Sequence, residues 1–165
     1  MKTYRTIAGL TPCLLFSLII NCAAQDIESI KPLFSTRKDV EKLVGVTSDP
    51  DISTGYYLMK NGTLIVGYSA GKCWENSRNE WDVARDVVIA FSYYPFTFER
   101  FKSEDFTDYI RYPTAMRDRY QYKNQSKGKS ITTSKDDKNP TIDIIYSFYT
   151  FPTEDQKKIK CPPKD

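Results

Sequence analysis

The sequence predicts an α+β domain in which a short N-terminal helix packs on an antiparallel β-sheet. A capping residue, Thr36, precedes a short amphipathic run that ends at Gly45. Two β-prone runs then flank Asn61-Gly62, and several later runs alternate apolar and polar residues. The two halves of the chain share the order helix, hairpin, loop and long strand, which is compatible with two helix–hairpin–strand units.

The helix is predicted over residues 37–44. Thr36 can accept a hydrogen bond from the first turn, and Asp39 lies at the third helical position, as in a capping box. Gly45 suits the left-handed conformation that commonly ends a helix. Because barely two turns are too short to be stable alone, the helix must pack on the sheet. Its apolar face is supplied by Val40, Leu43 and Val44.

The strands are predicted from alternation and from turn residues. Asn61-Gly62 predicts a type I′ hairpin turn, because both residues tolerate a positive φ. A helix capped by Ser103 is expected over residues 104–110, where aromatic residues recur at loosely helical intervals. Thr153 is expected to cap a last helical turn. The predicted strands cover residues 55–60, 63–69, 86–94, 117–124, 130–134 and 141–151.

The first 24 residues have the features of a secretory signal peptide. Lys2 and Arg5 precede an apolar run, and small residues precede Gln25, as signal peptidase requires. The apolar run is too short and too interrupted for a transmembrane helix, and no similar run follows in the mature chain. The predicted organisation is a signal peptide (1–24), an N-terminal linker (25–34), one domain (35–161) and a C-terminal tail (162–165).

Export predicts a secreted or periplasmic location for the mature chain. An alternative begins the mature chain at Cys22, because residues 19–22 loosely resemble a bacterial lipobox, with asparagine in place of the usual small residue. In that alternative, Cys22 is lipidated and anchors the domain in the cell envelope. Loss of the signal peptide lowers the formal net charge from +3 to about +1, which gives no electrostatic case for nucleic-acid binding.

Two cysteines, Cys73 and Cys161, remain after cleavage at Ala24. Two thiols in an oxidising compartment usually pair, so we predict a disulfide between them. In the chain-entropy model, closing a loop of that length stabilises the fold by at most roughly 4–5 kcal/mol. A redox or nucleophilic cysteine is disfavoured, because the chain has no histidine and no Cys-x-x-Cys motif.

Motifs that could support catalysis or metal binding are weak. Residues 67–71 match G-x-S-x-G, but they end a hairpin strand and no histidine is present to complete a catalytic relay. Histidine is also absent as a zinc ligand. We therefore predict a non-enzymatic domain without a cofactor or metal. The less favoured alternative is a hydrolase that uses carboxylates, for example Asp136 and Asp137 or Glu104 and Asp105.

Aromatic residues are unusually frequent, with twelve Tyr and nine Phe. Exposed tyrosines together with arginines are typical of protein interfaces and of sugar-binding platforms. The simpler interpretation is that these rings suit strands and fill a modest core. The candidate interaction surface consists of Trp74, Trp81, Tyr93, Tyr94, Phe96 and Phe98.

Residues 34–45 (FSTRKDVEKLVG), followed by paired strands, resemble the opening of the BamE/SmpA family and of its structural relative, the β-lactamase inhibitory protein. Over nearly all of residues 35–161 the layout is similar to an uncharacterised family of small secreted bacterial proteins, including the Gly-x-Cys at Cys73 and the ending from Pro152 to Cys161. The first resemblance implies a protein-interaction or envelope-assembly module with an unknown protein partner. It also makes a secreted enzyme inhibitor the alternative.

Overall fold

The computed structural model describes residues 27–47, 53–73, 81–97, 100–102, 106–116, 118–135, 138 and 142–162. The predicted signal peptide and Cys22 therefore lie outside the described residues. Within the described ranges, no helix is both long enough and apolar enough to cross a membrane.

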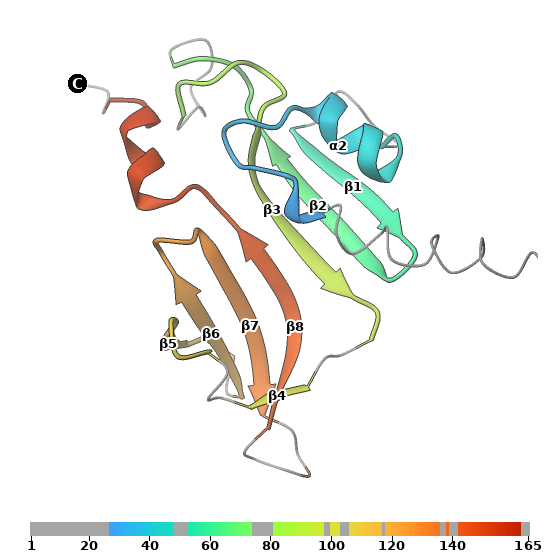
Figure 1. Ribbon diagram of the computed structural model, residues 1–165, viewed down its shortest axis with the longest axis vertical. Helices are drawn as coiled ribbons and strands as arrows, with labels where there is room; N and C mark the ends of the chain where they lie inside the picture. The colour runs from blue at the N-terminus through green and yellow to red at the C-terminus, as the bar shows by residue number, and fades with distance from the viewer. Residues whose placement is uncertain are drawn as a thin grey trace, which may run out of the picture.

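Eight strands form one antiparallel sheet (Figure 1). Their order across the sheet is β1-β2-β3-β8-β7-β6-β5, and β4 pairs with β8 outside this path. The helices are α2 (Arg37–Val44) and the 3₁₀ helix η2 (Glu154–Ile159). The strands are β1 (Thr54–Met59), β2 (Gly62–Tyr68), β3 (Val88–Pro95), β4 (Arg100–Lys102), β5 (Ile110–Pro113), β6 (Arg119–Asn124), β7 (Lys129–Lys135) and β8 (Ile142–Thr150).

The fold is mainly β, so the predicted α+β class with two helix–hairpin–strand units is wrong. Strands occur at all six predicted places, but the second helix does not form over the described part of its predicted range. No α-helix is present over residues 106–110: Phe106 has a 3₁₀ conformation, residues 107–109 form a turn and bend, and Ile110 begins β5. The aromatic spacing there reflects packing on the sheet, since the rings of Phe106 and Tyr122 lie 4.7 Å apart. The turn expected after Thr153 is the 3₁₀ helix η2.

The first helix and its capping box are confirmed. The Thr36 hydroxyl accepts a hydrogen bond from the Asp39 N–H at 3.3 Å, and the Asp39 carboxylate accepts one from the Thr36 N–H at 2.8 Å. The bond from the Thr36 backbone, followed by the bond from its hydroxyl, lowers the pKa of Asp39. Gly45 ends the helix with a φ of 93°, in the left-handed region that favours glycine.

The hairpin between β1 and β2 turns one residue earlier than predicted. Met59 pairs with Gly62, and neither Asn61 nor Gly62 has a positive φ, so the predicted type I′ turn over this pair is wrong. Gly62 is needed for space. A β-carbon at Gly62 would lie 2.5 Å from the Tyr94 carbonyl oxygen and 2.6 Å from the Tyr93 ring. Glycine therefore lets β3 lie close against the hairpin.

Cross-strand pairing aligns one row of side chains across the whole sheet, on the face that α2 covers. The row consists of Tyr57, Leu64, Tyr93, Phe148, Ile131, Tyr122 and Arg111. Two core clusters lie along this row. One packs under Val40 of α2, and the other surrounds Ile145 and Tyr122. Residues 27–34, expected to be a linker, contribute the buried Ile30 and Leu33.

A buried polar cluster attaches α2 to the sheet. Arg37 Nε lies 3.0 Å from Asp86 Oδ1, and its guanidinium carbon lies 4.0 Å from the centre of the Tyr68 ring. The hydroxyl oxygens of Tyr57 and Tyr68 are 2.6 Å apart and share a hydrogen bond. Burial raises the pKa of both tyrosines, so both hydroxyls remain protonated in the folded chain.

The predicted disulfide between Cys73 and Cys161 is confirmed, with Cα atoms 5.6 Å apart. It joins the chain after β2 to the chain after η2, across a sequence separation of 88 residues. Trp81 forms a β-bridge with Lys160 nearby, and the Asp82 N–H donates to the Ile159 carbonyl at 2.8 Å. Residues 159–161 are therefore held against the half of the sheet that carries α2.

Gly62→Ala should lower the free energy of unfolding by about 1–3 kcal/mol, because the added methyl group meets the Tyr94 backbone carbonyl as well as the Tyr93 ring. Gly67→Ala is the matched control, since a β-carbon there would meet nothing closer than 3.6 Å. Urea denaturation of both variants measures the difference. Equal losses would show that Gly62 is not needed for the close approach of β3.

Alkaline solution should destabilise the fold through Tyr57 and Tyr68. Unfolded tyrosine ionises near pH 10, whereas these two have raised pKa values when folded. The unfolded chain therefore releases protons first, and the free energy of unfolding falls as pH rises above about 10. Urea denaturation between about pH 8 and pH 11 should give a shallower fall for Tyr57→Phe/Tyr68→Phe than for the wild type. Identical slopes would contradict the assignment.

Candidate functional site

The candidate site lies where β3 separates from β8. The two strands pair over three residues only, ending with Tyr93 opposite Phe148. Further along β8, pairing resumes with β4, where Arg100 lies opposite Ile144. Six residues connect Tyr93 to Arg100, whereas three separate Ile144 from Phe148. The surplus chain prevents continuous pairing, and Figure 1 shows β3 and β8 diverging below their short contact.

A cleft of about 640 Å³ opens at this divergence. Its walls come from β3, β7, β8, the β1–β2 turn and the N-terminal residues before α2. It lies between the two core clusters, because Ile30 and Phe91 belong to one and Ile131 to the other. The apolar and aromatic lining residues are Ile27, Ile30, Met59, Phe91, Tyr93, Pro95, Tyr109, Ile131, Phe148 and Tyr149.

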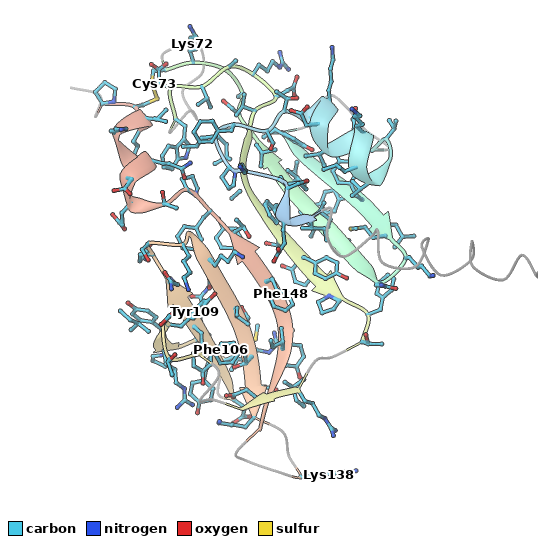
Figure 2. The ribbon with its side chains drawn as sticks, viewed as in Figure 1. Lys72, Cys73, Phe106, Tyr109, Lys138 and Phe148 are labelled. Carbon is cyan, nitrogen blue, oxygen red and sulfur yellow. A yellow bond between two sulfur atoms is a disulfide. The ribbon has the colours of Figure 1, made fainter. Side chains whose placement is uncertain are left out.

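Tyr93 and Phe148 form the junction between the two halves of the sheet. Their rings are stacked with centroids 6.4 Å apart, and the Tyr93 hydroxyl donates to the Asn61 carbonyl at 3.0 Å. In Figure 2, Phe148 lies between the halves, while Tyr109 and Phe106 lie on the side of β6 and β7. Burial raises the pKa of Tyr109, so its ring lines the cleft as a neutral phenol.

The remaining lining residues are polar or charged: Glu28, Lys60, Asn61, Thr97, Lys129, Ser130 and Thr150. Lys129 Nζ is 3.9 Å from Glu28 Oε1, and Lys60 adds a second exposed cation. Ser130 also lines the cleft; its side chain is 2% exposed, and its hydroxyl has no hydrogen-bond partner among the described residues. The Ser130 side chain points to the face opposite that of its neighbour Ile131, so this hydroxyl is directed away from Tyr93 and Phe148. The arrangement suits an apolar ligand with a few polar contacts.

The predicted aromatic surface is not one patch. Tyr93 lines the cleft, whereas Tyr94 and Phe96 are exposed to solvent. Tyr94 pairs with Thr63, which pairs with Leu58, so these three side chains share the face opposite α2. Tyr93 and Tyr94 therefore point to opposite faces of the sheet, as adjacent strand residues must.

The remaining predicted site residues lie elsewhere. Trp81 is partly buried near the disulfide, and Figure 2 shows Cys73 near one end of the molecule, well away from Phe106. Trp74, Phe98, Cys22 and the carboxylates at 104, 105, 136 and 137 lie outside the described residues.

Ser69 of the G-x-S-x-G motif occupies a structural turn. Its hydroxyl donates to the Gly71 carbonyl at 2.9 Å and accepts from the Gly71 N–H at 3.1 Å. The described part of the chain contains no group of three or more His, Cys, Asp or Glu side chains that could hold a metal ion.

Sequence reasoning missed most of the cleft. Alternation in residues 141–151 marks Phe148 as an inward side chain, but no local signal pairs it with Tyr93, 55 residues earlier. Ile27 and Ile30 fall within the predicted linker, and their spacing of three is only a weak signal of a packed segment.

Comparisons with protein-family models, with curated proteins and with solved structures found no match.

Proposed function

We propose that this chain is an exported, non-enzymatic binding domain that takes an apolar segment of a partner protein into the cleft. The cleft itself is the observation that supports the proposal. Its volume of about 640 Å³ falls within the range of ligand sites, and its lining is mostly apolar and aromatic.

The lining favours large apolar side chains as the bound groups. Burying one such side chain contributes about 1.5–3 kcal/mol, so two or three of them give useful affinity. Lys60, Lys129 and Glu28 can hydrogen-bond to the backbone of the same segment at the rim. The resemblance of residues 34–45 to families that act by binding other proteins supports the same interpretation.

Export is part of the proposal. The disulfide between Cys73 and Cys161 supports it, because structural disulfides persist outside the reducing cytosol. The signal-like features of residues 1–24 point to the same secreted or periplasmic location. Lipidation at Cys22 is the alternative form of export.

A secreted enzyme inhibitor is the second candidate function. Tyr94 and Phe96 are exposed where the chain leaves β3, next to the cleft-lining Pro95 and Thr97. Such an inhibitor would insert these two rings into an enzyme and would leave the cleft empty. Filling the cleft would then have no effect on binding.

Screening of displayed random peptides against the mature domain tests the cleft. We expect enriched peptides to carry at least two large apolar side chains and to bind with one-to-one stoichiometry in calorimetry. Thr97→Trp, at an exposed position of the rim, should weaken this binding about tenfold or more by placing a ring in the mouth of the cleft. Ala115→Trp adds the same ring at an exposed position away from the cleft and should leave affinity unchanged.

Two results would reject the cleft as the binding site. One is a screen that enriches no apolar peptides, and the other is equal binding by Thr97→Trp and the wild type. Thermal melting of both tryptophan variants checks that each remains folded.

Intact mass of the chain secreted by a bacterial host tests export. We expect a mature chain that starts at Gln25 and whose two cysteines are alkylated only after reduction. An acylated chain that starts at Cys22 would instead indicate an envelope lipoprotein. Free thiols at Cys73 and Cys161, or an uncleaved chain in the cytoplasm, would contradict the proposal.

A further inference from the structure

The two edges of the sheet differ in their protection against pairing with another strand. Edge strands are usually shielded by charged residues, proline, bulges or short length. β5 has four residues, carries Arg111 and ends at Pro113. β1 has six residues, TGYYLM, with no charge and no proline, and it pairs with β2 without a bulge. Within β1 itself, a charged residue, a proline and a bulge are therefore all missing.

The outer edge of β1 has free backbone groups. In the described part of the chain, residues 54–59 pair with β2 and have no further backbone hydrogen bonds. In an antiparallel ladder, each strand directs alternate N–H and C=O groups to each side, so those on the outer side of β1 remain available. They form a template for one more strand.

Two apolar side chains lie beside this edge, on the face opposite α2. Leu58 is 80% exposed and Tyr56 is 56% exposed. Between them, Tyr57 is buried under α2. Tyr56 belongs to a row that continues through Ile65 and Ser92 to the exposed Tyr149, so an added strand would extend an existing surface.

We propose that β1 pairs antiparallel with β1 of a second copy of this chain, about a two-fold axis through Tyr57. Residues directly opposite each other share a face of the sheet. In this register Tyr56 lies opposite the partner's Leu58, and symmetry repeats the pair. Both exposed side chains are thereby covered by the same residues of the other copy, in an aromatic–aliphatic pair of the kind that stabilises sheets.

The expected dimer is weak and reversible. The two exposed side chains offer roughly 250 Å² per copy, whereas a standard stable interface buries about 800 Å² per partner. Backbone hydrogen bonds along β1 add to this area. We therefore expect a dissociation constant on the order of 10 µM. This pairing does not depend on the proposed binding of a protein segment. Of the residues of β1, Met59 alone lines the cleft, whereas the proposed pairing is centred on residues 56–58.

Sedimentation equilibrium of the mature chain tests the pairing over roughly 1–300 µM. We expect a monomer–dimer equilibrium in the wild type. Leu58→Lys should raise the dissociation constant at least about tenfold, because it places a charged side chain directly opposite the partner's Tyr56. Val46→Lys is the matched control, since Val46 is 82% exposed in the segment after α2 and is not part of β1. It should leave the dissociation constant unchanged.

Tyr56→Lys provides a second variant in case Leu58→Lys does not fold, and thermal melting checks each of them. Hydrogen exchange at high concentration should show added protection of the β1 amides in the wild type and in Val46→Lys. A chain that remains monomeric throughout the range would overturn the proposal. So would a dimer that is unchanged by both β1 variants, or one without protection of β1.

Discussion

The short pairing between β3 and β8 is the constraint on which the rest of the structure depends. It joins two half-sheets that each have a core, one under α2 and one around Tyr122 and Ile145. The longer chain path on the β3 side stops the ladder after Tyr93 opposite Phe148. The cleft is the space left where the two halves cannot pair further, and the rings of Tyr93 and Phe148 lie at this point.

The disulfide acts at the other end of the same junction. It ties the chain after β2 to the C-terminus, beside the bridge between Trp81 and Lys160. Among the described residues, the cleft end is crossed by weaker contacts, such as the exposed pair of Lys129 and Glu28 at 3.9 Å. Exposed ion pairs contribute about 0–1 kcal/mol, so the width of the cleft is set mainly by packing of its rings.

Local features of the fold could be predicted from the sequence, because local signals determine them. The cap at Thr36 and the strand patterns need only neighbouring residues, and two cysteines allow one pairing. The fold class could not, since Phe106 and Tyr109 have spacing that suits either a helix or rings packed on a sheet. Gly62 shows the same limit, because its role depends on β3, some thirty residues later.

The cleft and the outer edge of β1 lie on different parts of one sheet. Tyr93 and Phe148 lie on the face that α2 covers, whereas Tyr56 and Leu58 lie on the opposite face. Pairing through β1 would therefore leave both clefts accessible in a two-fold dimer. A partner protein with two apolar segments could then bind both clefts, and the second contact would be intramolecular. Such avidity can exceed the affinity of a single cleft by about 10²–10⁴, so a weak dimer and a weak cleft together can give tight binding.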